Sequence, residues 1–172
     1  MNFERVRQMQ HLGKILPVDG YEVRLTTSLP TDYIHSLYHL YQPLIGIEAI
    51  SLYQTLLLQI EIQSEVSIQT HHTLMTYLNL PLDQIYEARL KLEGIGLLKT
   101  YQFDSDDRVY FTYELQAPFS PRQFFADMML SELLYRHLGK SRYTLLKNFY
   151  SKNNERDIGK DITSSFSDVF QT

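Results

Sequence analysis

The six histidines are the side chains of this sequence best suited to bind a metal or to transfer a proton. His35 and His39 stand four residues apart, the spacing that puts two zinc ligands on one helix face. A closed zinc site needs four ligands, however, and neither a glutamate after His35 nor a third ligand is evident. We interpret His71 and His72, which would point to different faces, as surface or capping residues, and His137 as a residue near a helix end, where the dipole favours a cation.

No other arrangement of side chains indicates catalysis. The sequence has no cysteine, which excludes disulfides and thiolate metal ligands and suits a reducing cytosol. We find no Ser-His-Asp combination with supporting context, no glycine-rich phosphate loop and no paired carboxylates with a pocket signature. The sequence therefore predicts a protein that is not an enzyme and that needs no metal or cofactor.

Residues suited to nucleic-acid binding gather in the last third of the chain. Eight basic residues lie between Arg122 and Lys160, against four acidic ones. Cations beside aromatic rings suit a single strand, because the cations neutralise phosphates and the rings stack on bases. The commoner explanation of such a run is a solvated helix face beside a partner surface. The candidate DNA-binding residues here are Lys140, Arg142, Lys147 and Lys152, interleaved with Tyr143, Phe149 and Tyr150.

The middle of the chain has the opposite charge. From Leu25 through Ala88 there is no lysine or arginine. Asp83 and Glu87 stand one helical turn apart and share a face, which must be the exposed one because an apolar stripe occupies the other. Phosphates repel carboxylates, so this helix is poorly suited to read a DNA groove. The inward stripe consists of Leu82, Ile85, Ala88 and Leu92.

The elements that position these residues follow one order between Ser67 and Leu115. A helix to Asn79, a turn at Asn79 to Pro81 and a second helix ending near Gly94 and Gly96 form a helix-turn-helix. Two alternating strands then form a hairpin, whose polar tip is Asp104 to Asp107. The order predicts a winged helix in a mainly α, α+β fold, with Lys99 and Arg108 as candidate DNA-binding residues of the wing.

Further elements are predicted before this module. The stretch Leu16 to Leu25 is typical of an extended arm that pairs with another strand. A helix capped by Thr31 or Asp32 is expected to end at Pro43, and a second helix to run from Gly46 to about Gln63. The longest apolar stretch, around Ala49 to Ile62, is too short and too polar to span a bilayer. The charged first residues show no secretory signal.

Two helices are predicted after the hairpin. Ser120 can cap the first, with Gln123 in the capping-box position, and Gly139 ends it. The second runs from Ser141 to about Lys152. The first of these helices is apolar over a wider arc than one neighbour can cover, so we expect the surplus to form a symmetric interface between copies. The candidate interface residues are Phe124, Phe125, Met128, Met129, Leu133 and Tyr135.

The resulting organisation has three parts. Residues 1–15 are expected to be an N-terminal extension, and residues 16–152 a winged-helix domain with flanking helices. Residues 153–172 are polar, and we expect poor order there and the start of a linker to a second domain.

Several blocks resemble the N-terminal domain of the primosomal DnaB/DnaD family of low-GC Gram-positive bacteria, the replication initiation and membrane attachment protein rather than the hexameric helicase of the same name. These blocks are the arm LPVDGYEV, LYQPLIGIEAISLYQTL from Leu40, LKLEGIGLLKTY from Leu90, and YELQAPFSPRQFFADMML with LGKSRYTLLKNFY between Tyr113 and Tyr150. They cover nearly the whole chain up to about Tyr150.

The resemblance implies a helicase-loading scaffold that acts in replication initiation and restart. The implied partners are a DnaD-like primosomal protein, a helicase loader and the replicative helicase, together with further copies of the chain in dimers or tetramers. Single-strand binding in the family is attributed largely to a later helical domain, so DNA is expected to bind this part weakly if at all. The resemblance also implies a cytoplasmic, nucleoid location with membrane association of the full-length protein. The alternative hypothesis is a direct DNA-binding winged-helix module.

Overall fold

The computed structural model describes residues 14–63, 69–152 and 159–170. It contains a small sheet with the strand order β2-β1-β4-β3. β1 (Gly20–Leu25) runs parallel to β4 (Arg108–Leu115), which pairs antiparallel with β3 (Leu98–Ser105), while the short β2 (Gln69–Thr70) pairs antiparallel with the other side of β1. The predicted arm is thus confirmed as a strand, and its partner is the hairpin.

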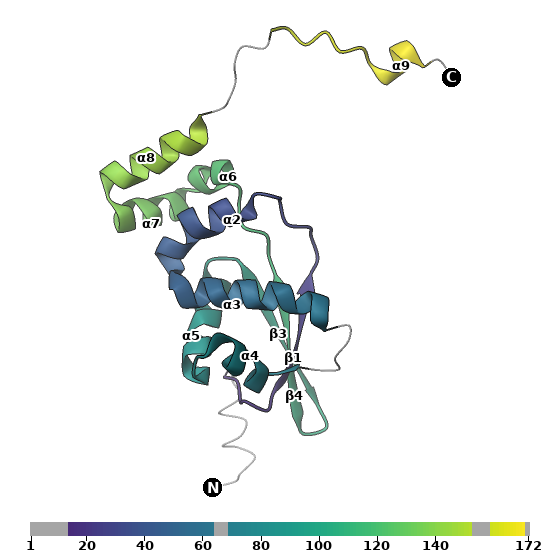
Figure 1. Cartoon of the computed structure of the whole chain (residues 1–172), viewed down its shortest axis with the longest axis vertical. Helices are drawn as coiled ribbons and strands as arrows, with labels where there is room; N and C mark the ends of the chain where they lie inside the picture. Colours follow the sequence, from purple (N-terminus) through teal and green to yellow (C-terminus); the bar gives the residue numbers. More distant parts are fainter. Residues whose placement is uncertain (1–13, 64–68, 153–158, 171–172) are drawn as a thin grey trace.

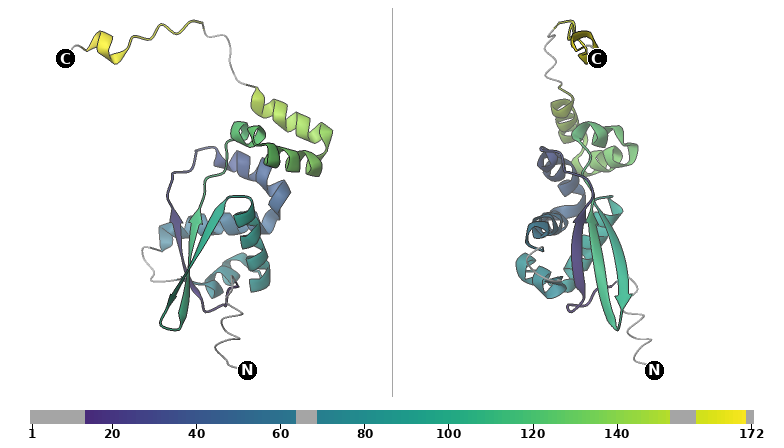
Figure 2. Two further views of the ribbon diagram at one scale, coloured as in Figure 1. Left: turned by 180° about the vertical axis from the view of Figure 1, so that it is seen from behind. Right: turned by 90° about the vertical axis from the view of Figure 1, so that its right-hand side faces the viewer.

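Helices cover one face of this sheet (Figures 1 and 2). The helix-turn-helix consists of α4 (His71–Leu78) and α5 (Leu82–Gly94), joined through the left-handed residue Asn79. The predicted start of the first helix at Ser67 lies outside the described residues, and the prediction is wrong at Gln69 and Thr70, which form β2 instead. Together with the β3–β4 hairpin these elements confirm the winged helix and the α+β class.

The core lies between the sheet and α3 (Gln42–Ile62). Strand alternation turns every second residue of β1 and β4 inward, because side chains of a strand point to opposite faces in turn. The predicted apolar stripe of α5 also packs into this core, with Ile85, Ala88 and Leu92 buried. The inward strand residues are Tyr21, Val23, Phe111, Tyr113 and Leu115.

The first flanking helix does not end at Pro43, and that prediction is wrong. α2 (Tyr33–Ser36) continues through a π-helical segment, η1 (Leu37–Tyr41), into α3, and Pro43 lies in the first turn of α3. Proline has no N–H to donate to the preceding turn, and the segment before it is π-helical, with the Gln42 amide bonded five residues back to the Leu37 carbonyl. The break comes at Gly46, where φ is 84° and ψ is 170°. The predicted second helix after Gly46 is confirmed.

The single helix predicted from Ser120 to Leu138 is also wrong, because it is broken at Asp127. α6 (Pro121–Ala126) begins with the predicted capping box of Ser120 and Gln123. Asp127 is extended, and its carboxylate accepts a hydrogen bond from the Leu130 amide at 2.9 Å, which caps α7 (Met128–Leu138). Gly139 then ends α7 as predicted, and α8 (Lys140–Ser151) follows.

The ends of the domain differ from the predicted division in one respect. Ile15, assigned from sequence to the extension, is buried in the core. Residues 1–13, 153–158 and 171–172 lie outside the described part of the chain. Residues 159–170 are described and include α9 (Phe166–Val169), all of whose residues are exposed.

The segment Tyr33–Ile62 is long and apolar enough, by length and composition alone, to cross a membrane. Its second half contains the apolar stretch from Ala49 to Ile62. Gly46 interrupts the segment, and α3 packs against β1, β4, α4, α5 and α7. Ala49, Tyr53 and Leu56 are completely buried there. We therefore assign this segment to the core of the domain.

Candidate functional site

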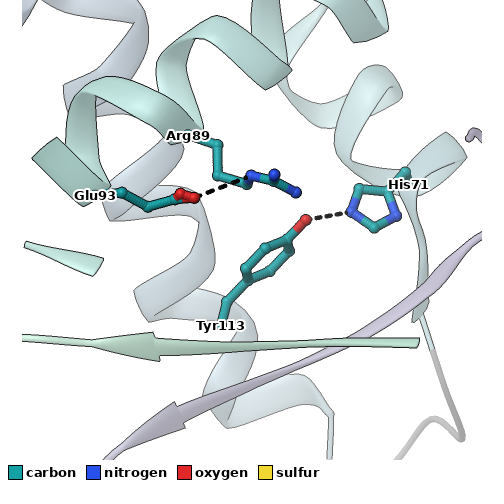
Figure 3. Close-up of polar contacts among 4 residues, drawn as sticks. All are labelled: His71, Arg89, Glu93 and Tyr113. Atoms are coloured by element: carbon teal, nitrogen blue, oxygen red, sulfur yellow. Dashed lines mark hydrogen bonds and ion pairs between the residues drawn. The ribbon is translucent and has the colours of Figure 1, made fainter. Parts of the chain in front are cut away.

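His71 lies in the core at the start of α4, and the prediction that it is a surface residue is wrong (Figure 3). Its Nδ1 is 2.6 Å from the carbonyl oxygen of Asp19, and its Nε2 is 2.6 Å from the hydroxyl of Tyr113. A carbonyl only accepts, so Nδ1 carries the proton and Nε2 accepts from the Tyr113 hydroxyl. Burial lowers the pKa of His71 to about 4, so the ring is neutral at pH 7. His72 is exposed, as predicted.

Arg89, on the predicted recognition helix, is not among the residues predicted from the sequence. It is buried, with its Nε 3.4 Å from the carboxylate of Glu93 on the next turn (Figure 3). Its guanidinium lies 5.1 Å from the ring centre of Tyr86 and 5.4 Å from that of Phe111. The sequence does contain a signal for this burial, because position 89 is one helical turn after Ile85 and so lies on the same inward face.

The outer face of α5 therefore gains no positive charge from Arg89. Asp83 and Glu87 are both exposed, as predicted, and Lys91 is the exposed cation of this helix. Two carboxylates against one ammonium make a poor surface for the phosphates that flank a major groove. The geometry thus favours a winged helix that does not read duplex DNA through α5.

The two wing residues Lys99 and Arg108 are exposed at opposite ends of the hairpin. Lys99 stands across from Glu114, and Arg108 across from Ser105. The turn beside Arg108 is made by Asp106 and Asp107, both with positive φ, as in a two-residue hairpin loop.

The four candidate cations of the C-terminal helix lie far from the wing. Lys140, Arg142 and Lys147 are exposed on α8, and Lys152 is exposed just after it. The Lys147 ammonium lies 5.8 Å from the ring centre of Tyr143. α8 and the hairpin tip are at opposite ends of the folded domain (Figure 1). The structure therefore does not bring the six candidate DNA-binding residues together into one site.

The candidate interface residues divide into two groups. Phe124 is completely buried and packs edge-on against Tyr41, so its assignment to an interface is wrong, and Phe125 is half-buried against Phe124 and Tyr143. The other four keep large parts of their side chains in solvent. Their exposed fractions are 87% for Met128, 77% for Met129, and 45% for both Leu133 and Tyr135.

Of the pair His35 and His39, His39 has a structural role. The Nδ1 of His39 is hydrogen-bonded to the hydroxyl of Tyr150, which ties η1 to α8. No group of three or more potential metal ligands occurs within the described ranges.

Comparisons with known proteins agree with this geometry. Residues 15–172 match the family model described as the DnaB N-terminal winged helix domain. The chain is 33% identical over 168 residues to the replicative helicase loading/DNA remodeling protein DnaB of Staphylococcus aureus (strain NCTC 8325 / PS 47), which covers 96% of this chain and 36% of that protein. It is thus similar to about a third of that relative.

A solved structure is also similar. Primosome protein DnaB (residues 1–300) from Geobacillus stearothermophilus is 40% identical to the chain, with a TM-score of 0.82. The match covers 90% of this chain and 59% of the other.

Proposed function

Because this chain belongs to the family of DnaB N-terminal winged-helix domains, we propose that it serves DNA replication as an assembly module in the loading of a replicative helicase. In this proposal the domain joins copies of itself and holds other primosomal proteins, rather than reading duplex DNA. The proposal rests on the named relatives, on the acidic outer face of α5, and above all on the apolar surface of α7 and α8.

The apolar surface of α7 and α8 is the observation that carries the proposal. α8 buries none of its residues, and two of its apolar side chains lie largely in solvent. Leu145 is 67% exposed and Phe149 is 60% exposed. α7 buries only Leu134, while Met128 and Met129 are mostly in solvent. Exposed apolar side chains in this number are typical of a protein interface.

A second copy of this chain is the occupant that we propose for this surface. Homo-oligomers with a two-fold axis use the same patch on both subunits, and an apolar patch is self-complementary in a way that a charged patch is not. The charges on α7 support this choice. Glu132 and Arg136 pair with each other at 2.6 Å within the helix, so they need no partner from outside.

The wider partners follow from the family. We propose that the oligomer meets a DnaD-like protein, a helicase loader and the replicative helicase in the cytoplasm, at the nucleoid. Membrane association belongs to this proposal only for the full-length protein.

Direct DNA binding is a second candidate function, and one observation favours it. α8 contains no aspartate or glutamate, whereas Lys140, Arg142 and Lys147 are exposed on it. A helix of one charge sign beside aromatic rings suits phosphates and bases.

Light scattering coupled to gel filtration tests the assembly role. We expect the chain to form dimers or larger species, and the variants Met129→Glu and Leu145→Glu to shift the mass toward the monomer. Tyr77→Glu is the matched control, because Tyr77 is 64% exposed on α4, which packs against α3, α5 and β2. A wild-type mass equal to the monomer at every concentration, or equal masses for wild type and variants, contradicts the proposal.

A further inference from the structure

The sheet has a second face, opposite the helices. Among the described residues no helix covers this face, as the edge-on view in Figure 2 shows. The strand register arranges its side chains in rows that cross β1, β4 and β3. We call these rows together the wing platform. They are Gly20–Tyr110–Phe103, Glu22–Thr112–Tyr101 and Arg24–Glu114–Lys99, with Arg108 beside the first row.

Exposed aromatic rings dominate two of these rows. Phe103 is 64% exposed and stands across from Tyr110, and Tyr101 is 51% exposed and stands across from Thr112. Phenylalanine and tyrosine rings that stay largely in water contribute less to the stability of the domain than buried rings do. Such rings offer flat surfaces on which planar ligands can stack.

A hollow opens beside these rings. Its volume is about 360 Å³, and it is lined by Tyr21, Glu22, Phe103, Tyr110, Phe111 and Thr112. Gly20, the neighbour of Tyr110 on β1, contributes no side chain there. The volume is within the range of small-ligand pockets. The hollow is therefore large enough to receive a planar group such as a nucleobase.

Cations lie at both ends of the platform. Arg108 is at the hairpin tip, and Arg24 and Lys99 are at the other end, on either side of Glu114. Within the described ranges, none of these three cations belongs to an ion pair. The two carboxylates of the platform already accept hydrogen bonds, Glu22 from Thr112 at 3.4 Å and Glu114 from Gln116 at 3.1 Å. The three rows with Arg108 thus carry one more positive charge than negative, and the exposed turn residues Asp106 and Asp107 stand next to Arg108.

We propose that the wing platform binds single-stranded nucleic acid. Bases stack on Phe103, Tyr110 and Tyr101, and one base enters the hollow. Arg108 at one end and Lys99 and Arg24 at the other contact phosphates. Neighbouring rows are two residues apart along a strand, roughly 7 Å, so the platform accommodates a few extended nucleotides.

The arrangement favours a single strand over the two other candidate occupants. A duplex keeps its bases stacked on each other, so it cannot use the exposed rings. A protein segment would use the rings but would gain little from three cations spread over both ends of the sheet. Aromatic rings between cations are the pattern expected where stacking and phosphate neutralisation act together.

Fluorescence anisotropy with a labelled oligothymidylate of roughly 12 nucleotides tests the proposal with the 172-residue chain. We expect salt-sensitive binding, with a slope of log K against log salt of about −2 for three phosphate contacts. Tyr101→Ala and Phe103→Ala should each weaken binding roughly tenfold or more, whereas Phe103→Trp should retain it. Tyr77→Ala is the matched control, since Tyr77 is 64% exposed on α4.

Four results would overturn the proposal. The first is no binding at roughly 100 µM protein and low salt, the weak limit of ordinary non-specific binding. The second is unchanged affinity in both alanine variants, with circular dichroism showing that they are folded. The third is binding that is lost in a Lys140→Ala, Arg142→Ala, Lys147→Ala variant but not in the platform variants, which would locate the contact on α8. The fourth is a platform variant that changes the oligomeric mass and not the affinity, which would make the platform a protein contact.

This proposal stands independently of the assembly role. The oligomer test measures mass with variants of Met129 and Leu145, whereas the nucleic-acid test measures anisotropy with variants of Tyr101 and Phe103 on β3 and of the α8 cations.

Discussion

The His71 ring accepts a hydrogen bond of 2.6 Å from the Tyr113 hydroxyl and thereby joins helix α4 to strand β4 inside the core. The same ring donates to the Asp19 carbonyl at the start of the N-terminal strand. One neutral imidazole thus connects the arm, the helix-turn-helix and the wing.

The protonation of His71 should make the domain acid-sensitive. Its pKa falls from 6.5 in the unfolded chain to about 4 in the folded one, chiefly because burial disfavours the imidazolium. Between pH 4 and pH 6.5 His71 is therefore protonated in the unfolded chain but not in the folded one. The free energy of unfolding rises with pH over this range. The neutral His71 ring contributes roughly 3 kcal/mol to the free energy of unfolding. This contribution is fully present above about pH 6.5 and is lost below about pH 4.

Urea unfolding at several pH values measures this effect. The variant His71→Gln should flatten the pH dependence between pH 4 and 6.5 relative to wild type. His72→Gln is the control, because His72 is exposed on the same helix and should leave the dependence intact. Parallel curves for His71→Gln and wild type would show that His71 does not titrate in this way.

Removal of the Tyr113 hydroxyl should destabilise the domain. Tyr113→Phe keeps the ring but leaves Nε2 of His71 without its donor in a buried site, which costs about 1–3 kcal/mol. Chemical denaturation should show this loss, whereas Tyr110→Phe on the outer face should change stability little. Equal losses in both variants would argue against a special role of the buried hydrogen bond.

Gly46 should be intolerant of a side chain. Its φ of 84° and ψ of 170° belong to a region that is nearly restricted to glycine, so Gly46→Ala should cost about 1–3 kcal/mol. Gly94→Ala is the control, because Gly94 ends α5 without a positive φ, and a Cβ there would meet no atom within 4 Å. Thermal melting of both variants gives the comparison. A melting temperature for Gly46→Ala that matches wild type would contradict the strained geometry.

The Asp127 carboxylate should stabilise the start of α7. Asp127→Ala removes the acceptor of the Leu130 amide and should cost about 1 kcal/mol, while Asp127→Asn should retain most of the cap. Amide hydrogen exchange in the first turn of α7 provides the measurement. We expect faster exchange in the alanine variant alone, and equally slow exchange in all three proteins would rule out this cap.

The sequence predicted those features that local chemistry determines. Alternation identified the wing strands, the serine and glutamine of the capping box identified the start of α6, and the α5 stripe correctly placed Asp83 and Glu87 in solvent. Such patterns depend on residues a few positions apart, so one sequence is enough to detect them.

Features that depend on distant residues were missed. His71 is buried because Asp19 and Tyr113 supply its hydrogen-bond partners, and neither lies near it in the sequence. Phe124 faces the core because Tyr41 lies over it. The break at Asp127 could not be predicted for a different reason. Neither glycine nor proline marks it, and an aspartate is compatible both with an exposed helix position and with a helix cap.

The parallel pairing of β1 with β4 has a consequence for how the chain acquires its shape. β1 is synthesised first, yet its pairing with β4 must wait until Tyr110 has left the ribosome, after the whole helix-turn-helix has been made. At roughly 5–20 residues per second, the early strand waits several seconds with its backbone groups unpaired on that side. A helix-turn-helix and wing expressed without the arm would leave the edge of β4 unpaired. Such an edge can pair with another chain and promotes aggregation. The arm is therefore part of the smallest piece of this protein that can be expected to fold.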